Sequence, residues 1–196
     1  MANESALLSL AESLARRLAN AWSPELTAVH GDVTFQAIGS GGLLADLGAQ
    51  AAVLTVWPYR VTVNEQMRNL SASAARRTAG LANRPLALDV HLLLSIWTAN
   101  TATELAVFAW MLRELHREPI LDASTLSSNG GWAADEVVQL IPAEITVEDM
   151  MRIWDAIAPG YRLSAPYVAR IVQLDVEQPD ALPVLARRFD YGAVPS

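Results

Sequence analysis

The feature that most constrains the fold is an alternation of aliphatic residues that begins at Leu86. Apolar side chains fill every second position of this run, namely Leu86, Leu88, Val90, Leu92, Leu94 and Ile96. Because successive side chains of a strand point to opposite faces, a period of two predicts a strand with one wholly aliphatic face. Such a face must be buried, so we place this strand in the centre of a sheet.

Other segments also have strand-like composition. We predict strands over residues 33–38, 53–63, 136–141 and 167–174. In the second of these, apolar and polar positions alternate, with Val53, Thr55, Trp57, Tyr59, Val61 and Val63 on one face. Pro58 interrupts that strand and has no backbone donor, which predicts either an edge position or a bulge.

Three segments have helical periodicity. The first helix is predicted over residues 4–21, and Asn3 is expected to cap its start and Pro24 to end it. It has one apolar face, and Glu12 can form an ion pair with Arg16 one turn further on. That face consists of Leu7, Ala11, Leu14 and Leu18. Thr101 with Glu104 and Thr146 with Asp149 have capping-box spacing and predict two more helix starts. The apolar stripe of the helix that starts at Thr101 is Leu105, Phe108, Leu112 and Leu115. The stripe of the helix that starts at Thr146 is Met150, Ile153, Trp154 and Ile157, and this helix is expected to end at Pro159 and Gly160.

These elements predict an α+β fold in a single domain. Strands joined by loops, with helices segregated among them, are typical of a mainly antiparallel sheet flanked by helices. We assign the domain to residues 1–175. Residues 176–196 form an extended C-terminal arm, because prolines at 179, 183 and 195 prevent a continuous helix or central strand.

Composition and charge exclude several classes of protein. The chain has no cysteine, so disulfides, thiolate metal sites and thiol nucleophiles are ruled out. The longest stretch without a charged residue, Val90 to Thr103, is shorter than the roughly 20 residues of a membrane helix. The first eight residues show no basic leader before an apolar core, so we expect a cytoplasmic protein. The net charge of −7 argues against a nucleic-acid partner.

One segment of the chain has an excess of positive charge, although the net charge of the chain is negative. All cationic residues are arginine, and five of them lie between Tyr59 and Pro85 with a single acid, Glu65. Arginine suits bidentate pairing across an interface, so we predict an interface here or, equally, a solvated loop. The candidate residues are Arg60, Arg68, Arg76, Arg77 and Arg84.

Catalytic and cofactor motifs are weak. The three histidines, His30, His91 and His116, lack metal-ligand spacing, and we predict no metal and no cofactor. His91 near Asp89 is the only candidate for a base oriented by a carboxylate, and on it rests the alternative of a small hydrolase. The neighbouring carboxylates Asp135 with Glu136, and Glu148 with Asp149, point in different directions and form no natural dyad.

Two glycine-containing segments superficially suggest sites. The loop from Gly39 to Gly42 lacks the Lys-Ser or Lys-Thr of a phosphate-binding loop and is interpreted as a flexible insertion. Trp132 follows two glycines, and we interpret it as a core residue or as part of an interface.

Several short motifs resemble one bacterial family. They are Tyr59-Arg60-Val61, Met67-Arg68-Asn69, Arg84-Pro85-Leu86 through Leu93, Leu112-Arg113-Glu114-Leu115-His116, Pro119-Ile120-Leu121, Ile153-Trp154, Gly160-Tyr161-Arg162 and Tyr167 through Val172. Their order and spacing over residues 4–175 are similar to those of the cap, or tail-terminator, proteins of contractile injection systems. Leu92 departs from the family pattern, which often has an aromatic residue there, and the Gly39 to Gly42 loop is longer than usual.

The resemblance implies a structural function without an active site. Family members form a ring, generally a hexamer, that ends the inner tube and holds the distal end of the sheath. It implies contacts with the neighbouring subunit, the tube and the sheath, and leaves open which face makes which contact. We expect the arm to dock on a neighbouring subunit or on the sheath through Leu182, Leu185, Phe189 and Tyr191. A tail terminator at the head-to-tail joint of a phage is an alternative with the same fold.

Overall fold

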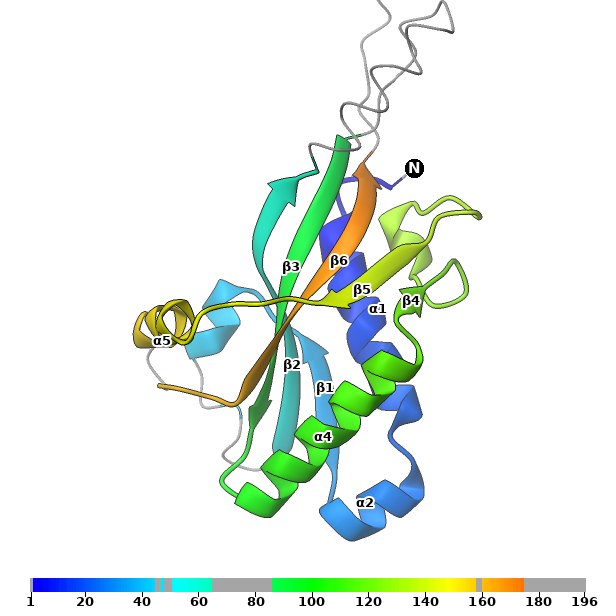
Figure 1. Ribbon diagram of the computed structural model, residues 1–196. Helices are drawn as coiled ribbons and strands as arrows, with labels where there is room; N and C mark the ends of the chain where they lie inside the picture. Colours follow the sequence, from blue (N-terminus) through cyan, green and yellow to red (C-terminus); the bar gives the residue numbers. More distant parts are fainter. Residues whose placement is uncertain (1, 45–46, 48–50, 65–85, 158–159, 175–196) are drawn as a thin grey trace, which may run out of the picture.

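The described strands form one six-stranded sheet. The computed structural model in Figure 1 describes residues 2–44, 47, 51–64, 86–157 and 160–174. The strand order is β1-β2-β3-β6-β5-β4. β1 pairs in parallel with β2, and all other neighbours are antiparallel, so the predicted α+β class is confirmed. The elements are α1 (Ala6–Ala21), α2 (Pro24–His30), β1 (Val33–Ala37), η1 (Ser40–Leu44), β2 (Ala52–Val63), β3 (Leu86–Trp97), α4 (Thr101–Arg117), β4 (Ile120–Leu121), η2 (Ser128–Gly130), β5 (Val138–Pro142), α5 (Val147–Asp155) and β6 (Ser164–Leu174).

β3 lies inside the sheet, as its aliphatic alternation predicts. Its neighbours are β2 and β6. Leu88, Val90, Leu92, Leu94 and Ile96 are buried in the main core, whereas Leu86 at the strand's start is exposed. The other face is buried as well towards the end of the strand, where Leu93 and Trp97 enter a second core. β3 therefore separates two hydrophobic layers.

α1 and α4 cover the side of the sheet that carries the main core (Figure 1). In α1 the predicted face is largely confirmed: Ala11, Leu14 and Leu18 are buried and Leu7 is half-buried. Burial of each leucine contributes about 1.5–3 kcal/mol to stability. α1 begins at Ala6 with Ser5 at the N-cap position, and Asn3 instead accepts a hydrogen bond from the Ser5 N–H.

One prediction near α1 is corrected, and one of the two interpretations of Trp132 is confirmed. Arg16 makes no ion pair with Glu12 among the described residues, and its guanidinium donates to the carbonyl oxygen of Thr125 at 3.0 Å. Trp132 packs against the main core, and its indole donates to Ser9 Oγ at 2.9 Å. The loop that carries η2 is therefore tied to α1 by internal hydrogen bonds.

The predicted core face of α4 is only half right: Phe108 and Leu115 pack in the main core, and the other two residues do not. Leu105 and Leu112 are exposed, whereas Val107, Trp110 and Met111 are buried with Leu115. The reason is the size of Trp110, whose ring lies 4.9 Å from that of Trp22. Large aromatic surfaces dominate such contacts, and they set the rotation of the helix.

α5 and η1 cover part of the other side of the sheet, and α5 is labelled at the left of Figure 1. Leu43, Met150 and Trp154 pack there against Leu93 and Trp97. The capping box of α5 is confirmed, because Thr146 Oγ1 accepts from the Asp149 N–H at 3.1 Å. The predicted stripe of α5 is confirmed too, with Ile153 and Ile157 partly buried. The glycine loop is not an open insertion, since it forms η1.

The structure adds elements that were not predicted. α2 begins at Pro24, where the first helix was expected only to end, and Ser23 Oγ accepts from the Leu26 N–H. β4 has two residues and pairs with β5, which begins at Val138 and not at residue 136. α4 is capped by Asn100, one residue before the predicted Thr101. Elements this short contain too few residues to show a hydrophobic periodicity in the sequence.

Candidate interaction surface

The geometry of the surface around Arg60 is set by a bulge in β2. The register between β2 and β3 shifts once, such that Pro58 lies opposite Leu92 and Arg60 lies opposite His91. Tyr59 is the extra residue, as in a β-bulge. β1 ends at Ala37, before this point, so Pro58 lies where β2 has a neighbour on the β3 side only among the described strands. The bulge predicted from Pro58 is confirmed, although β2 as a whole is not an edge strand.

The bulge changes which residues share a face. Directly opposite residues of an antiparallel pair point to the same side. Val61 and Val63 lie opposite Val90 and Leu88, whose side chains enter the main core. The prediction that both valines share a face with Trp57 is therefore wrong. Arg60 is turned to the other side, together with Tyr59.

Beyond the area covered by α5 and η1, no other described element covers this side of the sheet. We call it the open sheet face: Tyr59, Arg60 and Thr62 of β2 with Asn64 just after it, Asp89 and His91 of β3, Val168 and Arg170 of β6, and Gln139 and Ile141 of β5. None of these residues is buried. Four strands thus present a mixed polar surface with arginines on β2 and β6. A broad surface of this kind suits a protein partner better than a small ligand.

The polar groups of the open sheet face bond to one another. Thr62 Oγ1 lies 3.3 Å from His91 Nε2, and Asn64 Nδ2 donates to both carboxylate oxygens of Asp89, at 3.1 and 3.0 Å. No hydrogen bond among the described residues joins Asp89 to His91. Burial and the nearby charge of Arg60 lower the pKa of His91. The pair on which the hydrolase alternative depended is therefore not assembled as a base with an orienting carboxylate.

A shallow pocket of about 460 Å³ lies between the open sheet face and α5. Its lining residues are Tyr59, Arg60, His91, Glu144, Ile145, Thr146, Asp149, Arg152 and Ile153. Asp149 bonds to Thr146 at the start of α5, and Arg152 pairs with Glu148 at 2.5 Å. These charges stabilise the helix, and Glu148 and Asp149 bond to different partners.

An apolar patch lies on the outer side of α5. Val147, Met151 and Tyr161 are 75%, 41% and 48% exposed. They line a pocket of about 520 Å³ together with Ile145 and Pro166. Exposed apolar side chains gathered at one place are typical of a surface that another protein covers.

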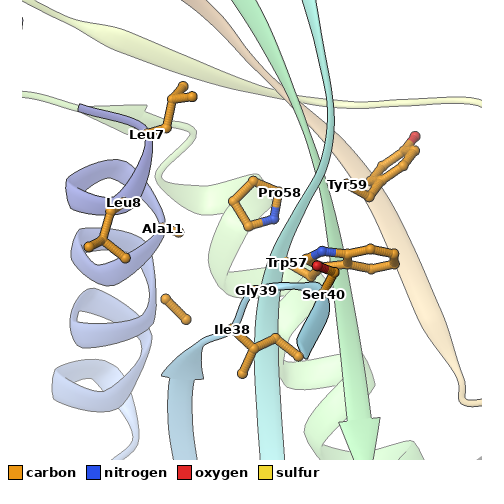
Figure 2. Close-up of a pocket in the computed structure, with 10 residues that line it drawn as sticks. Leu7, Leu8, Ala11, Ile38, Gly39, Ser40, Trp57, Pro58 and Tyr59 are labelled. Atoms are coloured by element: carbon orange, nitrogen blue, oxygen red, sulfur yellow. The ribbon is translucent and has the colours of Figure 1, made fainter. Parts of the chain in front are cut away.

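A third surface is the groove between α1 and β2, which we call the α1 groove (Figure 2). It has a volume of about 390 Å³ and is lined by Leu7, Leu8, Ala11, Ala37, Ile38, Gly39, Ser40, Trp57, Pro58 and Tyr59. Figure 2 shows Pro58 pointing towards α1, and Trp57 and Tyr59 pointing away from it. Nothing in the sequence marked this groove, because it arises where β1 stops short of the end of β2.

Most residues predicted as contacts cannot be placed on these surfaces. Arg60 is exposed on the open sheet face. The other candidate arginines, Arg68, Arg76, Arg77 and Arg84, lie outside the described residues, as do the arm residues Leu182, Leu185, Phe189 and Tyr191. Within the described segments, no helix is long and apolar enough to cross a membrane, and no three potential metal ligands cluster.

The sequence comparison identifies the family. Residues 9–186 match the family model described as the Pvc16 N-terminal domain. The chain belongs to this family. Membership in the Pvc16 N-terminal domain family confirms the resemblance drawn from the short motifs. A search of curated proteins gave no match.

Two solved structures have similar folds. The anti-feeding prophage cap, a tube-terminating cap, is 16% identical, with a TM-score of 0.51 over 90% of this chain and 58% of that chain. The sheath/tube terminator of the extracellular contractile injection system PVC, in its extended state, is 17% identical, with a TM-score of 0.45 over 77% and 54%. The chain thus spans little more than half the length of these proteins, and it shares its fold with the prophage cap.

Proposed function

We propose that this protein is a structural cap of a contractile injection system. In this function it forms a ring, terminates the inner tube and anchors the distal end of the sheath. The observation that carries the proposal is the match of residues 9–186 to the Pvc16 N-terminal domain family. The fold shared with the anti-feeding prophage cap supports it.

The described surfaces fit a protein that acts through contacts. The open sheet face, the α5 patch and the α1 groove are separate, and a cap in a ring needs separate surfaces for its neighbours, the tube and the sheath. No described cluster joins a nucleophile, a base and an orienting group, so the cap is proposed to be non-enzymatic. It would assemble with its particle in the cytoplasm, as a hexamer.

The ring is tested with the purified full chain. Mass photometry at micromolar concentration is expected to show a hexamer, alone or after the tube protein of the same system is added. A strict monomer under both conditions would contradict a ring.

Capping is tested in cells that assemble the particle. Deletion of the gene is expected to give tubes of uncontrolled length and sheaths that detach at the distal end, as seen by electron microscopy. Tubes and sheaths of normal length without the protein would contradict the proposal. If the deletion instead stopped head joining in a phage, the phage terminator would be the correct alternative.

The contribution of the open sheet face is tested by charge reversal. Arg60→Glu is expected to impair complementation of the deletion, because it places an acid on the exposed basic part of this face. Arg113→Glu on the exposed side of α4 is the matched control and is expected to complement fully. Equal complementation by both variants would remove Arg60 from the interface.

A further inference from the structure

The outer edge of β2 is half vacant. β1 pairs with β2 only from Ala52 to Val56. Just after β1, the Ile38 N–H donates a backbone hydrogen bond to the Val56 carbonyl oxygen at 3.0 Å. β2 continues to Val63, and there its only described neighbour is β3. An open edge of this kind presents backbone donors and acceptors to an added strand.

The α1 groove lies beside this vacant edge. β1 covers α1 further along, where Val33, Phe35 and Ala37 pack against the main core. At the groove that cover is missing, and Leu8 is 59% exposed. Figure 2 shows Leu7 and Leu8 on the helix and Pro58 across the gap. An extended segment in the groove would continue the line of β1 and cover Leu8.

The rim of the groove is acidic. Glu12 stands one helical turn after Leu8 on the same face of α1, and Glu4 lies just before the helix begins at Ala6. Both are exposed, and neither forms an ion pair with another described residue. The groove therefore suits a segment that combines apolar side chains with cations.

The C-terminal arm has this chemistry. It contains Leu182, Val184 and Leu185, and Arg187 and Arg188 follow after Ala186. The described chain ends at Leu174, which pairs with Leu86 and bridges to Ala2 at the same end of the sheet. The residues after it can span up to roughly 70 Å when extended, which is enough to reach another molecule.

We propose that the arm of one copy binds in the α1 groove of a neighbouring copy, as an added extended segment along the outer edge of β2. The proposal rests on the ring proposed above. The arm leaves from β6 and the groove lies beyond β2, on opposite sides of β3, which gives a head-to-tail contact.

Disulfide trapping tests the contact directly, because the chain has no cysteine of its own. Leu8→Cys and Leu185→Cys chains are purified separately, mixed and oxidised. A covalent dimer is expected. Val29→Cys, which is 74% exposed on α2, replaces Leu8→Cys as the control and is expected to give none. If a chain with both Leu8→Cys and Leu185→Cys closes only on itself, or if the mixture gives no dimer, the proposal is overturned.

A second test separates this proposal from the ring itself. Leu8→Glu is expected to weaken ring assembly roughly tenfold or more while leaving the melting temperature unchanged, because Leu8 is exposed in the single chain. Leu105→Glu, 56% exposed on α4, is the control and is expected to assemble normally. A hexamer that forms normally with Leu8→Glu refutes the arm contact but keeps the cap, whereas a wild-type chain without rings contradicts the cap itself.

Discussion

The indole Nε1 of Trp97 donates a hydrogen bond to Thr55 Oγ1 at 2.9 Å, which joins β3 to β2 within the sheet. The Thr55 hydroxyl donates in turn to the carbonyl oxygen of Ser95 at 3.3 Å. Trp97 is fully buried and Thr55 is 1% exposed. Neither group has access to water, so the Trp97 N–H depends on the Thr55 hydroxyl for its hydrogen bond.

Replacing Thr55 with valine should therefore destabilise the protein. Thr55→Val keeps the shape of the side chain but leaves the Trp97 N–H buried without an acceptor. We expect the free energy of unfolding to fall by about 1–3 kcal/mol, measured by urea unfolding. Thr34→Val, at an exposed position of β1, is the control and should change it by less than about 0.5 kcal/mol. Equal effects of the two variants would contradict the internal hydrogen bond.

Gly130 is required where the loop carrying η2 packs on α1. A Cβ atom at position 130 would lie 2.2 Å from Trp132 Nε1 and 2.8 Å from Ser9 Oγ. Gly130→Ala should displace the tryptophan and lower the free energy of unfolding by about 1–3 kcal/mol. Gly41→Ala, where a Cβ meets nothing within 4 Å, is the matched control. Wild-type stability of Gly130→Ala would show that the loop repacks freely.

The sheet could be predicted where one face of a strand is buried along its length. The alternation from Leu86 to Ile96 fixes both strand and face, because a slip of one residue would expose every leucine on it. The face of α4 could not be predicted in this way. Leu105 and Trp110 both fit helical periods, and only the contact of Trp110 with Trp22, from a distant part of the chain, decides between them.

The candidate surface was predicted only in part. Pro58 indicates a bulge. The bulge also reverses the side of the sheet on which Arg60 and Val61 lie, compared with the side that a regular alternation along β2 predicts. The α1 groove depends on where β1 stops, and no residue type marks that point. α2 did carry a readable signal, since Ser23, Pro24 and Glu25 are a helix start with a cap and a proline in the first turn.

The start of α4 distinguishes the observed cap from the predicted one. Asn100 Oδ1 accepts from the N–H groups of Ala102 and Thr103, at 2.9 and 3.2 Å. Asn100→Ala should lower the free energy of unfolding by about 1 kcal/mol, because these donors lose their partner. Thr101→Ala, at the position predicted from the capping box, should be nearly neutral in the same denaturation experiment. If Thr101→Ala lowered the free energy of unfolding more than Asn100→Ala does, Thr101 would be the N-cap, as the capping-box spacing predicts.

The coupling between Arg60 and His91 should be visible as a pH effect. Burial, then the positive charge of Arg60, lowers the pKa of His91 below its ordinary value of 6.5. The unfolded chain therefore takes up this proton first, so the contribution of His91 to stability is complete above pH 6.5 and is lost as the pH falls through the folded-state pKa. Arg60→Gln should raise the pKa of His91, measured by NMR titration of the imidazole, and so make that loss of stability at low pH smaller. Arg152→Gln, which neutralises the other arginine of the same pocket, should have a smaller effect, and an unchanged His91 titration in Arg60→Gln would show that the two side chains are not coupled.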